Sequence, residues 1–155
     1  MNKNTFVVDA SALLAAWLPG ESYRDEANGL LHDYMRHGIE LSAPSYLPAE
    51  LLNGLYMAVR GKGGQSPRIA LEQALRAWAA FEKLRIPLHD TTTLAPRALE
   101  LAREYNRPST YDMVYIALAE QLQTTFLTAD QRLVQAVSDK LSWVLPLAKY
   151  TSPGI

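Results

Sequence analysis

The sequence contains no cysteine and only three histidines, at positions 32, 37 and 89. The absence of cysteine excludes a disulfide framework and a thiolate zinc site, and it suits a reducing cytoplasm. The histidines do not have the spacing of a zinc motif on one helix face. A structural zinc site of the usual kind is therefore not expected.

The chain also lacks a hydrophobic run of transmembrane length. Residues 6–18 are apolar enough to resemble a signal peptide, but Asp9 interrupts them. We therefore expect a cytoplasmic protein that is neither secreted nor inserted in a membrane.

Neither sign of charge dominates, since 15 Lys and Arg residues stand against 16 Asp and Glu residues and the formal net charge is −1. This balance counts against a broad groove that binds nucleic acid by counterion release alone, so a phosphate substrate would require help from a metal. The length of 155 residues and the hydrophobic fraction of 48% fit one globular domain over residues 1–155.

Hydrophobic periodicity and turn residues divide the chain into alternating strands and helices. The predicted strands are 5–8, 39–42, 86–88, 124–127 and 143–147, and the predicted helices are 10–18, 22–37, 46–60, 66–84, 91–105, 111–122 and 130–138. The order implies an α/β/α architecture with a mostly parallel sheet. Gly61, Gly63 and Gly64 separate two helices that we expect to form a hairpin, the second capped by Ser66 with Pro67 at its first position.

Four carboxylates occupy the starts of predicted helices. Asp9 and Asp130 follow predicted strands, Asp112 begins a helix that is otherwise almost wholly apolar, and Glu50 lies in the first turns of another helix. Taken singly, each residue has an ordinary explanation as a helix cap or a first-turn acid. Ligands of parallel sheets bind beyond the carboxyl ends of the strands, so Asp9 and Asp130 should share one edge.

Taken together, the four acids indicate a metal site more strongly than any one of them alone. If the helices beginning near Glu50 and Asp112 point their N-termini at the same edge, like charges converge there and a cation would relieve their repulsion. Oxygen ligands without histidine or cysteine favour Mg²⁺ or Mn²⁺. Such ions activate water and neutralise phosphate oxygens, which is the chemistry of phosphodiester hydrolysis.

Four segments carry a family resemblance: VVDASALLAAWL around Asp9, PAELLNGL around Glu50, STYDMVYIALAEQL around Asp112 and TFLTADQRL around Asp130. In this order, across nearly the whole chain, they resemble the PIN-domain nucleases, and within them the VapC-like toxins of prokaryotic toxin-antitoxin modules. The resemblance implies that the four acids bind one or two Mg²⁺ or Mn²⁺ ions.

The resemblance also implies a cytoplasmic homodimer that cleaves transfer, ribosomal or messenger RNA as an endoribonuclease and is inhibited by a cognate antitoxin protein. Ser11 and Thr128 match auxiliary polar positions, although each hydroxyl could equally be a cap or a strand-end group. Asn53, one helical turn after Glu50, also matches, and it either orients that carboxylate or faces solvent.

Several basic residues lie near plausible substrate paths. They are Arg60, Lys62, Arg68 and Arg107. Each is a candidate phosphate contact, although a solvated loop charge is the commoner explanation. Trp17, Tyr56 and Trp78 lie on predicted apolar helix faces, where core or dimer packing is favoured over base stacking.

Other functions remain open at this point. The chain could be a stand-alone PIN nuclease in RNA processing or decay, or a PIN scaffold that binds RNA or protein without cleavage. A phospho-aspartate receiver would need Asp9, Asp90 and Lys149 as its site, but Asp9 lacks an adjacent acid and Lys149 lacks a following proline. The receiver is therefore disfavoured.

Overall fold

A computed structural model of the chain describes residues 4–154. Five parallel strands form one sheet in the order β3-β2-β1-β4-β5. The strands are β1 (Thr5–Val8), β2 (Glu40–Pro44), β3 (Leu88–His89), β4 (Thr125–Thr128) and β5 (Val144–Pro146). The predicted parallel sheet is confirmed, and Pro146 lies on an edge strand, where its missing N–H is tolerated.

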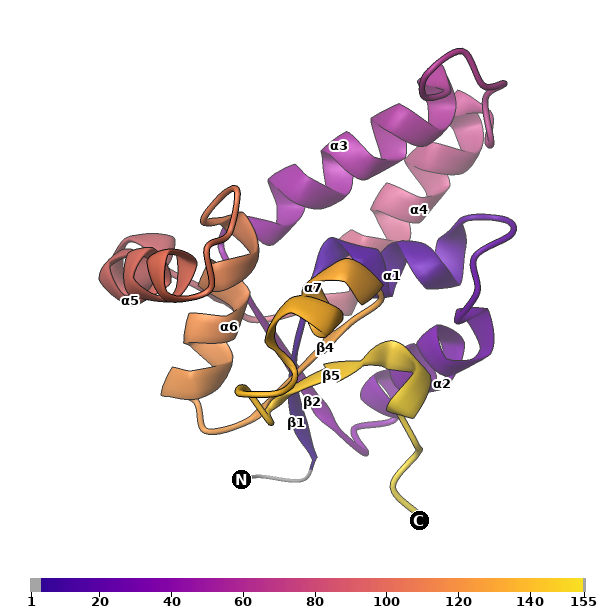
Figure 1. The fold of residues 1–155 in the computed structure, drawn as a ribbon. Helices are drawn as coiled ribbons and strands as arrows, with labels where there is room; N and C mark the ends of the chain where they lie inside the picture. Colours follow the sequence, from indigo (N-terminus) through magenta and orange to yellow (C-terminus); the bar gives the residue numbers. More distant parts are fainter. Residues whose placement is uncertain (1–3, 155) are drawn as a thin grey trace.

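Helices cover both faces of this sheet (Figure 1). They are α1 (Ala10–Trp17), α2 (Arg24–Met35), α3 (Leu47–Arg60), α4 (Leu71–Leu84), α5 (Thr91–Glu104), α6 (Tyr111–Gln121) and α7 (Gln131–Val137), with a 3₁₀ turn at Leu147–Lys149. Helices α1 and α2 lie on one side of the strands, and α5 and α6 lie on the other (Figure 1). The three-layer α/β/α architecture predicted from the sequence is therefore present.

The core is densest along α6. Every residue from Met113 to Ala119 is buried, because this helix packs on β1, β2 and β4 and under α5. The Tyr115 ring stacks on Phe126 of β4, with ring centroids 5.6 Å apart. The prediction of a buried helix that begins beside Asp112 is confirmed.

Helices α3 and α4 form the predicted hairpin, which projects from the body as an arm (Figure 1). The prediction that Ser66 and Pro67 begin α4 is wrong, because the helix begins at Leu71. The backbone N–H of Arg68 donates to Ala58 O at 2.8 Å, which folds the loop back onto α3. The first turn of α4 is instead closed by the Gln73 side chain, whose Oε1 accepts from Ala70 N at 2.8 Å.

Other predicted boundaries also differ from the structure, most of them by one or two residues. Helix α2 ends at Met35 rather than at residue 37, because His37 has a left-handed backbone (φ 60°) that stops the helix. Strand β3 is displaced from 86–88 to Leu88–His89, where it pairs with Ala43 and Pro44 of β2. Within residues 4–154, no helix is both long and apolar enough to cross a bilayer.

Candidate active site

Asp9 lies where β1 ends and α1 begins, and it is buried, with 4% of its surface exposed. Its Oδ1 accepts hydrogen bonds from the Ser11 hydroxyl at 2.6 Å and from Ala12 N at 3.1 Å. Its Oδ2 accepts from the Thr128 hydroxyl at 2.6 Å. The predicted cap role is therefore real, and the same carboxylate is also fixed to the end of β4.

Thr128 and Ser11 connect the ends of β1 and β4. The strands pair in a register that sets Val8 opposite Leu127, so Asp9 and Thr128 meet at one edge of the sheet. The Ser11 hydroxyl oxygen accepts from Ala129 N at 2.9 Å, and Thr128 Oγ1 accepts from Asp130 N at 3.1 Å. Both hydroxyls predicted as auxiliary positions thus contact Asp9 directly, and their part in any chemistry stays a prediction.

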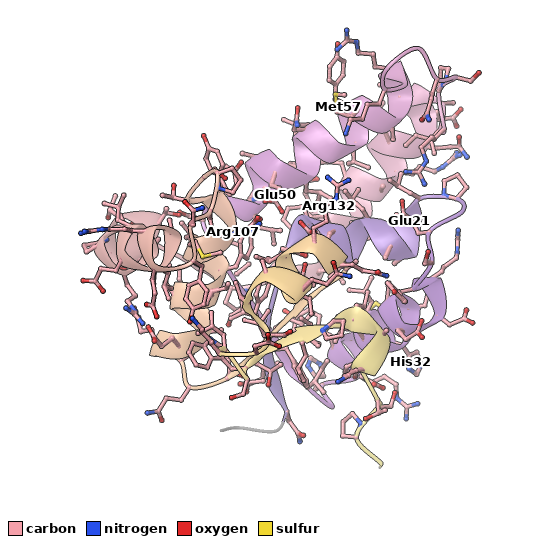
Figure 2. All side chains as sticks on the ribbon, in the orientation of Figure 1. Glu21, His32, Glu50, Met57, Arg107 and Arg132 are labelled. Carbon is pink, nitrogen blue, oxygen red and sulfur yellow. The ribbon has the colours of Figure 1, made fainter. Side chains whose placement is uncertain are left out.

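Glu50 reaches the same edge from the first turn of α3, at the base of the arm (Figure 2). Its Oε1 accepts from Ala10 N at 2.9 Å. Helix α3 begins after Tyr46, and Pro48 in its first turn has no N–H to satisfy, so the sequence favours a helix start here. Glu50 is therefore bound to the residue that follows Asp9.

Asp112 and Asp130 complete the set. Asp130 caps α7, since its Oδ1 accepts from Leu133 N at 3.1 Å. Asp112 is half-buried in the first turn of α6, and none of residues 4–154 donates a hydrogen bond to its side chain. Across those residues, no lysine, arginine or histidine forms a salt bridge with any of the four acids.

The environment of Asp9, Glu50 and Asp112 favours their neutral forms. Burial is the main cause that raises the pKa of Asp9 to about 6, and the charge of Asp112 adds to it. Burial followed by the charge of Asp9 raises the pKa of Glu50 to about 7. Burial followed by the charge of Asp130 raises the pKa of Asp112. The four carboxylates therefore repel one another across a shared, poorly solvated edge.

The donor chemistry fits a hard divalent cation. Neither oxygen of Asp112 accepts a hydrogen bond from residues 4–154, so its lone pairs remain available for an ion. Over the same residues, however, no three acidic, histidine or cysteine side chains are gathered closely enough to hold an ion. Coordination by three of these acids therefore requires side-chain movement when the ion binds.

Arg107 is a cation whose charge acts on Asp112. It lies in the loop before α6, and its charge lowers the pKa of Asp112 against the effect of burial. Its Nε is buried and has no hydrogen-bond acceptor within residues 4–154. Asn53, in contrast, is exposed and makes no hydrogen bond to Glu50, so its predicted orienting role finds no contact to support it.

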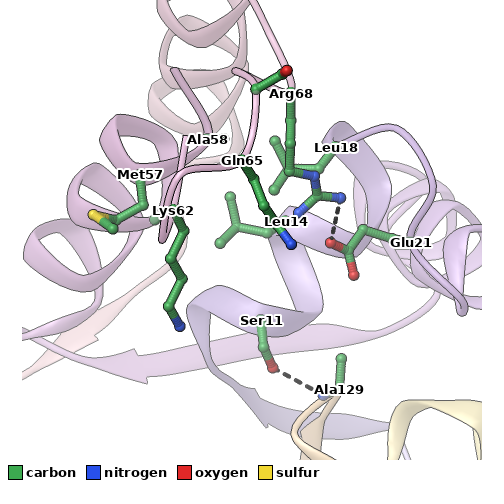
Figure 3. Close-up of a pocket in the computed structure, with 12 residues that line it drawn as sticks. Ser11, Leu14, Leu18, Glu21, Met57, Ala58, Lys62, Gln65, Arg68 and Ala129 are labelled. Carbon is green, nitrogen blue, oxygen red and sulfur yellow. Dashed lines mark hydrogen bonds and ion pairs between the residues drawn. The ribbon is translucent and has the colours of Figure 1, made fainter. Parts of the chain in front are cut away.

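A cavity of about 320 Å³ adjoins the acids between α1, α3 and the loop that joins α3 to α4. Ser11 and Ala129 form the wall nearest Asp9, and the Lys62 side chain extends from the loop on the other side (Figure 3). Lys62 has no ion pair within residues 4–154, whereas Arg68 bonds Glu21 at 2.8 Å and Pro19 O at 2.6 Å. Of the predicted phosphate contacts, Arg68 is thus already bonded to Pro19 and Glu21. Arg60 is exposed and lies at the end of α3.

Helices α1 and α3 approach closely beside this cavity. A Cβ at Gly54 would lie 2.5 Å from Cδ1 of Leu14, which explains a glycine inside a helix that it would otherwise weaken. Gly54 lies one helical turn after Glu50, so the close approach of the helices is on the same side of α3 as the acids. Helical spacing alone does not reveal this requirement, because the partner is on another helix.

Tyrosines also lie around the acids, and none of them was predicted from the sequence as part of the site. The Tyr115 hydroxyl is buried near Glu50, and Tyr46 stacks on Tyr111 at the starts of α3 and α6. A tyrosine among buried apolar residues is a signal that could have identified Tyr115. Of the aromatic residues expected in packed positions, Trp17 and Trp78 pack against the core, but Tyr56 is 57% exposed.

The model of one protein family, described as PIN domain, matches residues 6–138. The chain belongs to the PIN domain family. Ribonuclease VapC3 of Pyrobaculum aerophilum is 28% identical over 129 residues, covering 83% of this chain and 92% of that relative. Ribonuclease VapC9 of Mycobacterium tuberculosis is 31% identical over 128 residues, covering 82% of this chain and 87% of that relative.

The crystal structure of PAE2754 from Pyrobaculum aerophilum supports the same PIN fold, with a TM-score of 0.63 over 93% of this chain and 91% of that one. At 19% identity this likeness concerns the fold alone. The predicted resemblance to VapC-like PIN domains is confirmed, and a receiver is excluded.

Proposed function

We propose that this PIN domain is a divalent-metal-dependent endoribonuclease and the toxin of a toxin-antitoxin module. The observation that carries the proposal is the set of four acids at one edge of the sheet, without a salt-bridge partner in residues 4–154 and with raised pKa values at Asp9, Glu50 and Asp112. The names of the VapC relatives, which are ribonucleases, supply the substrate class.

The proposed ligands of Mg²⁺ or Mn²⁺ are Asp9, Glu50, Asp112 and Asp130. A bound ion would supply a Lewis acid for the phosphodiester oxygens and lower the pKa of water. Asp9 is the fixed member, because its hydrogen bonds hold both oxygens in place. Asp112 has no such restraint from residues 4–154, so it is the member that we expect to move toward the ion.

Ser11 and Thr128 are proposed as positioning residues for Asp9, and Arg60, Lys62 and Arg107 as contacts to RNA phosphates. Asn53 is retained only as a candidate contact on the exposed side of α3. We further propose that residues 1–155 act as one nuclease domain, as a homodimer in the cytoplasm, under control of a cognate antitoxin.

The direct test is cleavage of total RNA in Mg²⁺ or Mn²⁺ by the native protein and by Asp9→Asn and Asp112→Asn variants. Each substitution should reduce the rate on the order of 100-fold or more, since even outer-shell partners of metal sites contribute 10- to 100-fold. Asp139→Asn is the matched control, because Asp139 is an exposed acid outside the set. Equal cleavage by native and Asp112→Asn proteins would overturn the mechanism.

The toxin role needs a separate test. Induced expression of the native protein should arrest growth, and expression of Asp112→Asn should not. Co-expression of the product of an adjacent small gene should restore growth if that product is the antitoxin. Normal growth despite active enzyme would instead indicate a stand-alone PIN nuclease.

A further inference from the structure

Two tyrosines mark the rim of the acid set. The rings of Tyr46 and Tyr111 are stacked, with centroids 5.2 Å apart and planes 15° from parallel. Tyr111 directly precedes Asp112 at the start of α6. Tyr46 lies just before α3, and its carbonyl accepts from Glu50 N at 3.2 Å. The pair therefore joins the starts of the two helices that carry Asp112 and Glu50.

The outer member of this pair is unusually open for a large aromatic residue. Tyr111 is 57% exposed, whereas Tyr46 is half-buried beneath it. A mainly apolar cavity of about 280 Å³ continues from the pair, lined also by Thr91, Ala95, Ala98, Leu99, Thr110 and Val114. An exposed aromatic ring that stacks on a second ring and borders an apolar cavity is a suitable surface for stacking of another aromatic ring.

We propose that Tyr111, supported by Tyr46, is the platform on which a base of single-stranded RNA stacks beside the phosphodiester to be cleaved. This inference rests on the proposed nuclease function. Because the pair joins the helix starts that carry Glu50 and Asp112, a phosphodiester held at Asp112 would bring one flanking nucleotide near the tyrosine. The bases of a duplex are already stacked, so the platform selects unpaired segments.

The charges around the platform favour a base over an acidic peptide. Glu50 and Asp112 lie beside the pair and would repel peptide carboxylates, whereas a phosphodiester is accommodated with the cation proposed at the acids. Every base offers a face for stacking, so the contact gives affinity with little sequence preference.

The first test uses single-stranded RNAs of about 12 nucleotides, a length within the usual range of single-strand binding sites, each with one 2-aminopurine at a different position. Binding is measured in an Asp9→Asn background, which slows cleavage under the proposed function. We expect quenching of 2-aminopurine at one position, and quenching lost on Tyr111→Ala. The affinity should fall about 5- to 150-fold, which corresponds to ~1–3 kcal/mol per stacked base.

The second test separates stacking from folding and catalysis. With native acids, Tyr111→Ala should raise KM for single-stranded RNA far more than it lowers kcat, and Tyr111→Phe and Tyr111→Trp should restore KM. Tyr56→Ala is the matched control, because Tyr56 is also 57% exposed but stacks on no ring within residues 4–154. Quenching in the protein with Tyr111 intact tests the platform even if Tyr111→Ala fails to fold.

The outcomes distinguish this inference from the function on which it rests. Equal RNA affinity and KM in native and Tyr111→Ala proteins, with cleavage intact, overturn the platform alone. Absence of RNA binding and cleavage by the native protein overturns both. If light scattering shows that Tyr111→Ala dissociates a dimer while RNA affinity is unchanged, the pair is a contact between copies and the platform is overturned.

Discussion

The backbone N–H of Ala10 donates a hydrogen bond of 2.9 Å to Oε1 of Glu50. The bond joins the first residue of α1 to the first turn of α3, two elements separated by α2 and β2 in the chain. Because Ala10 follows Asp9 directly, the bond also sets Glu50 beside the buried aspartate. The Ala10 amide thus keeps Glu50 close to Asp9, although the two carboxylates repel each other.

This relationship predicts opposite effects for two substitutions of Glu50. Glu50→Gln keeps an oxygen that can accept from Ala10 and removes a charge, so the metal-free melting temperature should hold or rise. Glu50→Ala leaves the amide without this acceptor and should cost about 1–3 kcal/mol of unfolding free energy. Metal-dependent RNA cleavage should be lost in both. A glutamine variant that melts well below the native protein would contradict the predicted repulsion.

Thr128→Val tests the restraint on Asp9. The substitution keeps the shape of the buried side chain but removes the hydroxyl that donates to Asp9 Oδ2, so the pKa of Asp9 should rise further. We expect a loss of about 1–3 kcal/mol in urea unfolding and weaker binding of Mn²⁺ by calorimetry. Thr93→Val is the control, because the exposed Thr93 hydroxyl bonds Asp90 O and, within residues 4–154, no other group. Native Mn²⁺ affinity in Thr128→Val would argue against a positioning role.

The raised pKa values predict how stability depends on pH without metal. The pKa rises from 3.8 to about 6 at Asp9 and from 4.5 to about 7 at Glu50, so between pH 4 and 7 the folded state binds more protons than the unfolded state. The contribution of these groups is therefore most favourable below pH 4 and is lost as the pH rises through 6 to 7.

Urea unfolding at several pH values measures this effect. In the native protein the unfolding free energy should fall from pH 5 to pH 7.5 more steeply than in an Asp9→Asn, Glu50→Gln double variant. Saturating Mn²⁺ should offset the loss, since a ligand at 100 times its Kd adds about 2.7 kcal/mol. Parallel pH profiles of the two proteins would show that these acids are not desolvated as described.

Lys62 and Arg68 should behave differently despite their shared loop. Lys62 is free of ion pairs within residues 4–154 and borders the cavity beside Ser11. Lys62→Met should therefore weaken RNA binding, and the slope of log affinity against log salt concentration should fall by the contribution of about one phosphate contact. Arg68→Met should mainly lower the melting temperature, because Arg68 holds Pro19 and Glu21. RNA affinity measured across salt concentrations separates them. A larger loss of affinity in Arg68→Met would reverse this assignment.

The sequence alone predicts the parallel sheet and the position of Asp9 near Asp130. Alternating strands and helices predict parallel strands, and the carboxyl end of β1 and that of β4 then place Asp9 near Asp130. Both residues also cap their helices, so the ordinary and the functional interpretations are compatible. Glu50 depended on the family resemblance, because a first-turn glutamate carries no distinguishing local pattern.

Features that depend on contacts between distant elements were not predictable. The start of α4 was placed too early because a Ser-Pro pair resembles a helix start, whereas the bond from Arg68 N to Ala58 O keeps that segment in the loop. The stacking of Tyr46 on Tyr111 requires α3 and α6 to meet, and helical periodicity within either segment does not contain that information. The spacing of side chains around an ion is likewise set by packing.

Because Gly54 lies so close to Leu14, helix α3 of the arm and helix α1 of the body must have compatible residues at these two positions. A chimera that takes α3 and α4 from one PIN domain and the sheet from another would inherit Glu50 from the first parent and Asp9 from the second. A methyl group at position 54 would require Cδ1 of Leu14 to move out of the space between α3 and α1. Compatible parents are therefore those whose residues at positions 14 and 54 are exchanged together.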